Sequence, residues 1–412
     1  MHLTAAEIFP RLDEKIPAHR FERVASAIDG LFNRTLTYLE DGSPFIITGD
    51  IPAMWLRDST WQVRPLLHSS HPDVVELLIA LSKTQVRLFL IDPYANAFNP
   101  TPSGDCWHKD FKDQSPWVFE RKYELDSWAS ILFLARMITE KYGRTDHINE
   151  EFHKALNLMI ELARIEQNHD SSTYIFKREN GVAHDSLSHN GHGAPIAYTG
   201  MVYSAFRPSD DACVYGYLIP SNLFFMNELG NLSENLKTQK TRKLVEEISN
   251  GVKEFGVADG VLAYEVDGLG NQLFIDDANV PSLLSLPYLG CSTIEDPLYK
   301  ATRFSILSEN NPYFYSGIKA QGIGSQHTPL RHVWPIAIAI EAITQSETEV
   351  KKSALELLES SDAGTGFMHE SFHVDDEKIF TRPWFSWADM TYVQLVLDSV
   401  GYQVKERIIE PK

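Results

Sequence analysis

The chain has 412 residues, of which 43% are hydrophobic and 23% are charged, a composition typical of globular enzymes. Its 37 basic and 56 acidic residues give a net charge of −19, which disfavours contact with the phosphate backbone of nucleic acids. The sequence contains no run of 18 apolar residues, and this disfavours a membrane span.

The cysteines and the first residues bear on the cellular compartment. Cys106, Cys213 and Cys291 lie far apart and form no CxxC pair, so we expect buried free thiols rather than a disulfide framework or a zinc site. Residues 1–15, MHLTAAEIFPRLDEK, lack the apolar core of a signal peptide. Together these features predict a cytoplasmic location.

Helical periodicity dominates the chain. Residues 19–40 carry apolar positions at helical spacing, and Pro72 with Asp73 suits the first turn of a helix that ends at Asp92-Pro93. Ser346 and Glu349 have the spacing of a capping box. Further helices are expected over residues 122–142, 147–168, 210–228, 233–255, 278–288, 294–309, 327–345, 349–360 and 383–401.

Strand signals are few and local. Asp267-Gly268, inside LAYEVDGLGNQLF, indicates a β-hairpin, and residues 174–176 have the composition of a short strand. Strand and helix signals do not alternate along the chain, so the sequence does not indicate a parallel sheet. No linker or low-complexity tract divides residues 1–412. We therefore predict a single domain.

The predicted helices differ in how much of their surface is apolar. The segment 128–138 is apolar on more than one face, whereas 233–255 is amphipathic and rich in Lys and Glu. A helix that is apolar around its girth must be covered on several sides. About twelve helices of these two kinds predict an all-α (α/α)6 toroid, with an inner ring of six helices inside an outer ring of six, decorated by small β-hairpins.

The first polar cluster spans residues 48–59. Arg57 and Asp58 follow Trp55 at the predicted start of a helix. A carboxylate accepts hydrogen bonds from sugar hydroxyls, a guanidinium donates them, and an indole ring offers an apolar face to the sugar. The same residues would also suit a purely structural arrangement that caps the helix.

The second cluster is Arg207-Pro208-Ser209-Asp210-Asp211. Ser209 is predicted to be an N-cap, which places both carboxylates in a first helical turn. Two carboxylates crowded into a semi-buried cleft can raise the pKa of one of them, as a general acid requires. Two acidic residues at the start of a helix are also common without any catalytic role.

A third cluster, residues 367–373, places Glu370 in a loop among glycines and aromatic residues. A carboxylate there could deprotonate a water molecule as a general base, or it could simply be exposed or pair with Arg382. Glu120 and the run 123–127 form a further acidic group, which is more readily explained by an arginine partner or a helix cap.

The remaining polar segments are expected to form a rim. They are residues 274–282, 313–317 and 322–328, the last containing His327. Neither a nucleotide-binding glycine pattern nor an HExxH or EF-hand pattern occurs. His184, His189 and His192 share a glycine-rich loop, but their spacing does not by itself indicate a metal site.

Several ordered blocks resemble glycoside hydrolase family 125, the exo-acting α-1,6-mannosidases. The resemblance runs from about residue 15 to residue 400. Its blocks are TGDIPAMWLRDST (48–60), RPSDDA (207–212), DDANVPSLLSLPYLG (276–290), NPYFYSG (311–317), GIGSQHT (322–328) and MHESF (368–372). It implies an (α/α)6 barrel and the removal of terminal mannose from an oligosaccharide or N-glycan fragment, with inversion and without a metal or other cofactor.

The resemblance also implies residue roles. The general acid should be Asp210 or Asp211, and the general base Glu370. Substrate-binding side chains are expected at Trp55, Arg57, Asp58, Arg207, Asp277, Asn279, Ser325, His327 and His369. Gln394 stands where the family's last helix would be expected to carry a glutamate; were that position the base, catalysis would be damaged.

Inversion requires the two carboxyl groups to lie roughly 6.5–9.5 Å apart, with room for one water molecule between them. Trp107, Trp117 and Trp384 are candidates for the wall of the pocket or for the core. One alternative is a sugar epimerase or isomerase on the same barrel, with paired histidines from His108, His327, His369 and His373. Another is an inactive glycan-binding relative.

Overall fold

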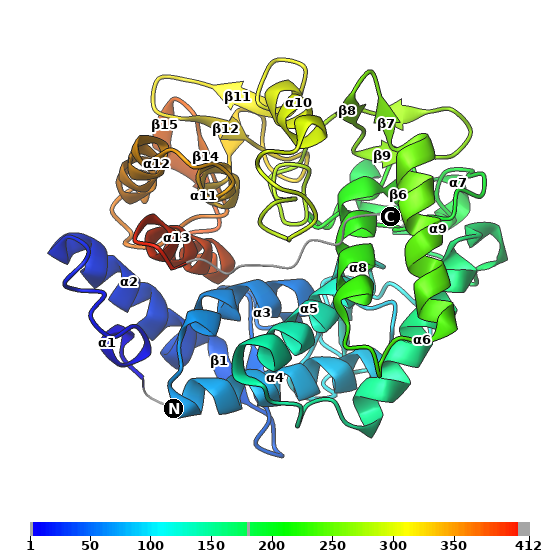
Figure 1. The fold of residues 1–412 in the computed structure, drawn as a ribbon, viewed down its shortest axis with the longest axis horizontal. Coiled ribbons are helices and arrows are strands. Elements are labelled where there is room, and N and C mark those ends of the chain that lie inside the picture. Colours follow the sequence, from blue (N-terminus) through cyan, green and yellow to red (C-terminus); the bar gives the residue numbers. More distant parts are fainter. Residues whose placement is uncertain (1–2, 179–181, 403–412) are drawn as a thin grey trace.

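The computed structural model describes residues 3–178 and 182–402. Its helices are wound around a common centre, and the last helix, α13 (Ser386–Ser399), returns to contact α2 (Ala18–Gly30) and α3 (Leu56–Val63) (Figure 1). The chain thereby closes into a ring, which confirms the predicted toroid of helices.

Inner and outer helices are distinguished by how much of their surface is buried. Every residue of α3 is buried, whereas α9 buries one stripe, as expected for helices covered on several sides or on one. The inner helices are α3, α5 (Leu125–Tyr142), α8 (Ile219–Asn231), α11 (Pro335–Ile343) and α13. The outer helices are α2, α4 (Pro72–Ile91), α6 (Glu150–Glu166), α9 (Gln239–Phe255), α10 (Pro297–Ile306) and α12 (Thr348–Ser360).

The inner ring is not helical throughout. Contacts join α13 to α3, α3 to α5, α5 to α8 and α11 to α13. Between α8 and α11 in the chain, buried turns over residues 284–290 take the place of an inner helix. The Asn227 amide of α8 donates to the carbonyl of Leu289, and Arg64 donates to that of Tyr288, so side-chain hydrogen bonds hold this segment where helical backbone bonds are missing.

Three small antiparallel sheets lie where the chain enters the inner helices. β3 (Met54–Trp55) leads directly into α3 and pairs with β4 (Ala97–Phe98), which pairs with β5 (Val118–Glu120). β6 (Tyr217–Leu218) leads into α8 and pairs with β9 (Glu265–Val266), itself paired with β10 (Gln272–Leu273). The third sheet joins β13 (His332–Val333), β14 (Ser371–His373) and β15 (Asp376–Thr381). These pairings fix the loops at the N-terminal ends of the inner helices.

The other regular segments are short. They are the helices α1 (Ala5–Ile8) and α7 (Ser188–Gly191), the pair β1 (Leu36–Tyr38) and β2 (Pro44–Ile46), the pair β7 (Val257–Ala258) and β8 (Val261–Leu262), and the pair β11 (Phe314–Ser316) and β12 (Gln321–Ile323). Single helical turns lie at Leu31–Thr35, Arg64–His68, His169–Ser171 and Ala183–Asp185.

Several predicted elements are confirmed. α4 begins at Pro72 and ends at Ile91, immediately before Asp92. The hairpin at Asp267-Gly268 exists as β9 and β10, with Gly268 at a positive φ of 74°, a conformation that glycine adopts without strain.

Other element predictions were wrong. The predicted helix 210–228 begins only at Ile219, and residues 278–288 form turns instead of a helix because Pro281 and Pro287 interrupt hydrogen bonding. The predicted helix 19–40 ends at residue 30, passes through one π turn and becomes strand β1. In 327–345 the helix starts at Pro335. Ser346 does not cap α12, whose N-cap is Glu347, and residues 174–176 are irregular rather than a strand.

One hydrophobic cluster extends from Leu3 to Leu397 and contains buried residues from both rings. It supports the single-domain prediction, which we retain as a proposal. Among the described helices, none is both long and apolar enough to cross a membrane.

Candidate active site

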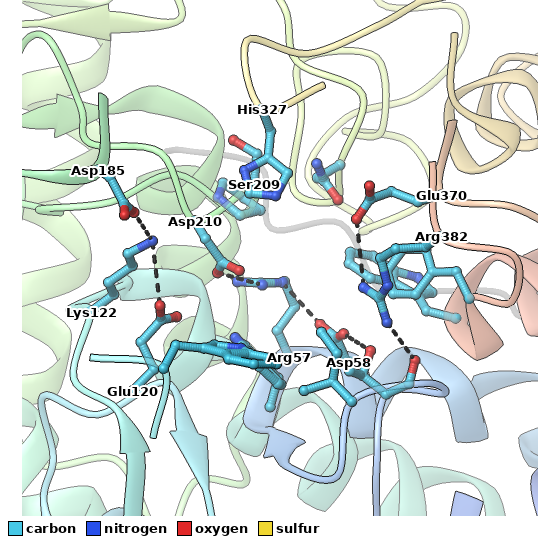
Figure 2. A pocket seen from close by; sticks show the side chains of 18 of the residues that line it. Arg57, Asp58, Glu120, Lys122, Asp185, Ser209, Asp210, His327, Glu370 and Arg382 are labelled. Carbon is cyan, nitrogen blue, oxygen red and sulfur yellow. Dashed lines mark hydrogen bonds and ion pairs between the residues drawn. The ribbon is translucent and has the colours of Figure 1, made fainter. Parts of the chain in front are cut away.

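A pocket of about 430 Å³ opens at the N-terminal ends of the inner helices. The wall residues come from the segments before the inner helices or from their first turns, except Asn279, which precedes the buried turns 284–290. Residues far apart in sequence therefore meet at one end of the ring (Figure 2). Helix N-termini carry partial positive charge and favour nearby carboxylates. The wall includes Thr48, Trp55, Arg57, Asp58, Trp107, His108, Glu120, Lys122, Arg178, Asp185, Ser209, Asp210, Asn279, His327, Trp334, Glu370, Arg382 and Trp387.

Arg57 lies at the floor of the pocket, among several carboxyl groups. Its side chain is 3% exposed and contacts four carboxyl groups: Glu124 at 2.5 Å, Asp126 and Asp210 at 3.3 Å, and Asp58 at 3.4 Å. Burial alone would lower the pKa of Arg57, but these carboxylates raise it well above its usual value. The guanidinium is therefore a fixed positive charge beneath any bound sugar.

Asp58 and Trp55 each have one buried polar atom that makes no hydrogen bond to the described residues. The Thr48 hydroxyl donates to Asp58 Oδ2, while Asp58 Oδ1 and Trp55 Nε1 are buried without a hydrogen-bond partner among the described residues. Because an unsatisfied buried polar atom costs free energy, such atoms are suited to ligand hydroxyls. Burial raises the pKa of Asp58, and Arg57 and Thr48 offset part of that effect.

Asp210 and Asp211 lie in a tight turn, and their side chains differ in exposure. Arg207 donates its backbone N–H to the Asp211 carbonyl, and Asp210 has a φ of 65°. Asp210 is 22% exposed and lines the pocket, whereas Asp211 is 1% exposed and accepts from the Ser209 hydroxyl at 3.1 Å. Ser209 is therefore not an N-cap, and neither carboxylate is in a helical turn.

His327 joins Asp211 to the pocket. Its Nδ1 lies 3.5 Å from Asp211 Oδ1, and 36% of its side chain is exposed. Desolvation alone would lower the pKa of His327, but Asp211, Glu370 and Asp210 raise it to about 9. At neutral pH the imidazole is a second positive charge at the pocket wall.

Glu370 is on the opposite side of the pocket from Asp210 (Figure 2). Its side chain is 9% exposed, and Arg382 Nη1 lies 3.5 Å from Glu370 Oε1. Arg382 also donates to Asp50 through Nε at 2.8 Å and Nη2 at 2.5 Å. Glu370 is therefore not an exposed loop residue, and the expected pair with Arg382 exists. Both residues of this ion pair line the pocket.

The side of the pocket beyond Asp210 is built from alternating charges. Lys122 contacts Asp185 at 2.7 Å and Glu120 at 3.4 Å (Figure 2), and Arg178 contacts Glu120 at 2.9 Å and Asp185 at 2.8 Å. Trp107, with 64% of its surface exposed, lies at this edge. Hydroxyl groups could exchange hydrogen bonds with these polar groups while a sugar ring stacks on the indole.

The pocket brings together most of the residues expected from the sequence. Seven line its wall: Trp55, Arg57, Asp58, Asp210, Asn279, His327 and Glu370. Two others, Asp277 and Ser325, lie one layer behind: Asp277 accepts from Ser209 at 3.2 Å and from Ser325 at 2.9 Å. Neither side chain lines the pocket, so their expected contact with substrate stays a prediction.

Arg207 and His369 do not line the pocket either. Arg207 is 1% exposed and donates to Glu265 at 2.6 Å. Glu265 in turn accepts from the backbone of Val214 and Tyr215. His369 is 1% exposed and stacks on Phe380, with ring centroids 3.8 Å apart. Both side chains support the loops that carry Asp210 and Glu370.

Sequence reasoning missed several contributors. Lys122, Arg178 and Asp185 reach the wall from loops whose pairing depends on the folded ring. Glu124 and Asn96 lie directly behind the wall: Asn96 Nδ2 donates to Glu124 at 3.1 Å and to Asp210 at 3.3 Å. The acidic run 123–127 was noticed, and its expected arginine partner exists, but that partner is Arg57 of the site itself.

Other candidates from the sequence lie elsewhere. Trp107 lines the pocket, whereas Trp117 lines a separate hollow and Trp384 donates to Asp389. Gln394 is buried in α13 beside His68, at 3.2 Å, so it is not placed to act as the base. Across residues 3–178 and 182–402, no three His, Cys, Asp or Glu side chains are grouped to hold a metal ion.

Comparisons with known proteins agree with this geometry. Residues 18–397 match the family model described as metal-independent α-mannosidase, GH125. A metal-independent α-mannosidase of Streptococcus pneumoniae, solved in a non-productive complex with α-1,6-mannobiose, is 42% identical. The match covers 98% of this chain and 100% of that one, with a TM-score of 0.93.

Two further matches are more distant. The meiotically up-regulated gene 157 protein of Schizosaccharomyces pombe is 36% identical over 430 residues, covering 96% of this chain and 84% of that protein. A structure described as a wild-type glycosidase is 13% identical with a TM-score of 0.54, covering 97% of this chain and 100% of its own. At this identity the likeness shows a common fold alone.

Proposed function

The chain belongs to glycoside hydrolase family 125, the metal-independent α-mannosidases, and we propose that it removes terminal α-1,6-linked mannose with inversion of configuration. The observation that carries this proposal is the placement of Asp210 and Glu370 on opposite sides of one pocket, with Arg57 and Asp58 between them (Figure 2). Inverting hydrolysis needs two carboxyl groups in that relation and a water molecule on one side.

In this proposal Asp210 is the general acid. It is the aspartate of the RPSDDA block that reaches the pocket, and Asp211 is held behind it by Ser209 and His327. As the bond from C1 to the leaving oxygen breaks, the Asp210 proton moves to that oxygen. The charged groups beyond Asp210, from Glu120 to Arg178, would bind hydroxyls of the leaving sugar.

Glu370 is the proposed general base. It takes a proton from a water molecule while the oxygen of that water attacks C1 from the face opposite Asp210. Arg382 Nη1 lies 3.5 Å from Glu370 Oε1 and fixes the carboxylate at the pocket wall. Asp58 and Arg57 hold the ring hydroxyls of the terminal mannose.

The proposed substrate class rests on a relative whose structure contains a bound sugar. The Streptococcus pneumoniae relative was solved with α-1,6-mannobiose in a study of N-linked glycan processing, and 42% identity over nearly the whole chain supports the same linkage here. We therefore propose mannose-containing oligosaccharides or N-glycan fragments as substrates. A cytoplasmic location stays a prediction; the free thiols of Cys106, Cys213 and Cys291 are compatible with a reducing compartment.

An NMR time course on α-1,6-mannobiose tests the proposal. We expect release of mannose whose first-formed anomer is β, as inversion of an α-linkage requires, and much slower cleavage of α-1,2- and α-1,3-mannobiose. Release of the α anomer would contradict inversion, and equal rates on all linkages would contradict the specificity.

The same experiment tests the alternatives. His108 and His327 both line the pocket, so free mannose is included as a substrate for the isomerase alternative. Conversion of mannose to a ketose without cleavage of mannobiose would overturn hydrolysis. Tight binding of mannobiose without any turnover would indicate an inactive glycan-binding protein.

A further inference from the structure

We propose that Glu124 is a positioning residue that holds the catalytic proton between turnovers and passes it to Asp210 when the leaving-group oxygen arrives. The inference rests on the proposed role of Asp210 and adds a residue that does not line the pocket. Glu124 lies just before α5, and its side chain is fully buried.

The two carboxyl groups share the same neighbours. The Asn96 amide nitrogen lies 3.1 Å from Glu124 Oε1 and 3.3 Å from Asp210 Oδ1, while Arg57 contacts Glu124 at 2.5 Å and Asp210 at 3.3 Å. The Asn96 amide and the Arg57 guanidinium therefore bridge the Glu124 and Asp210 carboxyl groups. A direct hydrogen bond between two carboxyl groups can form only when one of them is protonated, because a carboxylate has no donor.

The surroundings decide where the proton rests. Burial raises the pKa of Glu124, and Asp210 and Asp126 add to this effect against Arg57. Burial would also raise the pKa of Asp210, but Arg57, Lys122, Glu124 and His327 together lower it. The charged groups that face the pair are Arg57 and Asp58 from α3, Lys122 and Asp126 near α5, and His327 before α11. The resting proton is therefore on Glu124.

Catalysis requires that proton on the other carboxyl group. When the leaving-group oxygen approaches, the O–H bond of Glu124 breaks and an O–H bond forms on Asp210, which then donates the proton to the departing oxygen. The new Glu124 carboxylate keeps its contacts with Arg57 and with the Ser127 hydroxyl, which donates at 3.0 Å. After product release the pair takes one proton from solvent, and Glu370 loses to solvent the proton it took from water, so protons balance over the cycle.

Two substrates with different leaving groups distinguish a proton-transfer role of Glu124 from a purely structural role. An aryl α-mannoside with a strongly acidic phenol needs little acid assistance, whereas α-1,6-mannobiose needs full protonation of its leaving oxygen. For Glu124→Gln we expect kcat/KM on mannobiose to fall by about 10²–10³-fold, within the range of general acid catalysis, and on the aryl mannoside by less than about tenfold. The alkaline limb of the mannobiose pH profile should also move to lower pH, because Asp210 alone must then hold the proton.

Three parallel variants make the outcome decisive. Asp210→Asn should show the same leaving-group dependence more strongly; full activity on mannobiose in that variant would refute the proposed acid, and with it the function assignment. Glu228 does not line the pocket and forms a buried ion pair with Arg136, with 2.7 Å between Nε and Oε2. Glu228→Gln should therefore keep the wild-type ratio between the rates on the two substrates. Equal losses on both substrates in Glu124→Gln, with an unchanged pH profile, would refute the relay while leaving Asp210 as the acid.

Ser127→Ala provides a milder second test in case Glu124→Gln does not fold. The Ser127 hydroxyl donates only to Glu124 among the described residues, so its loss should disfavour the ionised Glu124 that remains after transfer. We expect about a three- to tenfold slower reaction on mannobiose, equivalent to one lost hydrogen bond, with an unchanged rate on the aryl mannoside. An unchanged mannobiose rate would count against the relay.

Discussion

Asp210 and Asp211 are neighbours in the chain, yet they belong to different layers of the site. Asp210 contacts Arg57 at 3.3 Å on the pocket floor, and Asp211 lies 3.5 Å from His327 behind the wall. The positive φ of Asp210 turns the backbone so that the two side chains diverge. This divergence assigns separate roles to two residues that are chemically identical.

The first prediction concerns these two aspartates. Asp210→Asn should lower kcat on α-1,6-mannobiose by at least about 10³-fold, because it removes the acid. Asp211→Asn should lower it far less, through the position and charge of His327. Steady-state kinetics on both purified variants, with circular dichroism as a check on folding, measures the difference. A larger loss in Asp211→Asn than in Asp210→Asn, with both folded, would exchange the two roles.

The second prediction concerns the base. Glu370→Gln keeps the size of the side chain but cannot accept a proton, so turnover should fall by about 10²–10⁴-fold. Binding of mannose or mannobiose, measured by calorimetry, should remain within a few-fold of the wild type. A substantial residual rate would remove Glu370 from this role.

The third prediction concerns the charge of His327. Its pKa is raised to about 9 in the folded protein, above the value of about 6.5 for an ordinary histidine. A raised pKa means that proton binding stabilises the folded state; this contribution is complete below about pH 6.5 and is lost as the pH rises through about 9.

NMR of the imidazole signals tests that value directly. In Asp211→Asn the pKa of His327 should fall towards the ordinary value, because Asp211 is the largest contribution that raises it. In urea unfolding, the wild type should lose stability relative to His327→Gln between pH 6.5 and 9. A His327 that titrates near pH 6 in the wild type would show that the Asp211 contact is weak in solution.

The fourth prediction concerns metal removal. The family is metal-independent, and proton transfer by Asp210 and Glu370 needs no Lewis acid. Prolonged treatment with EDTA, followed by gel filtration, should leave kcat and KM for mannobiose unchanged. Activity that falls and returns with added Ca²⁺ or Zn²⁺ would require a metal role that the proposed mechanism does not contain.

The predictability of the fold depended on the kind of signal. Periodicity located α4 and the other amphipathic or buried helices, since a helix must bury a stripe wherever it packs. Local sequence patterns gave wrong predictions where side chains bond to distant residues instead of to the neighbouring backbone. Ser209-Asp210-Asp211 has the composition of a helix start, but its side chains bond across the site to Asp277 and Arg57.

The site itself could be predicted only in part. Ordered blocks such as RPSDDA and MHESF narrow the acid to Asp210 or Asp211 and the base to Glu370, but they do not distinguish the two aspartates. The bridging of Glu124 and Asp210 by Asn96, and the contact of Arg382 with Asp50, depend on how the ring closes. No spacing in the sequence encodes contacts between residues this far apart.

The last prediction concerns Arg382. Its guanidinium is held by two hydrogen bonds to Asp50, at 2.5 and 2.8 Å, and lies over the ring of Phe385 at 4.4 Å, so its 3.5 Å contact with Glu370 is fixed in place. Arg382→Gln removes the ion pair that fixes the Glu370 carboxylate at the pocket wall, so kcat/KM on mannobiose should fall by about 10- to 10²-fold, because a displaced base loses its alignment with the water. Asp50→Asn is the matched control: it keeps the charge of Arg382 and loosens only its anchor, so steady-state kinetics should show a smaller loss. If the two variants lost equal activity, Arg382 would act on Glu370 through position rather than through charge.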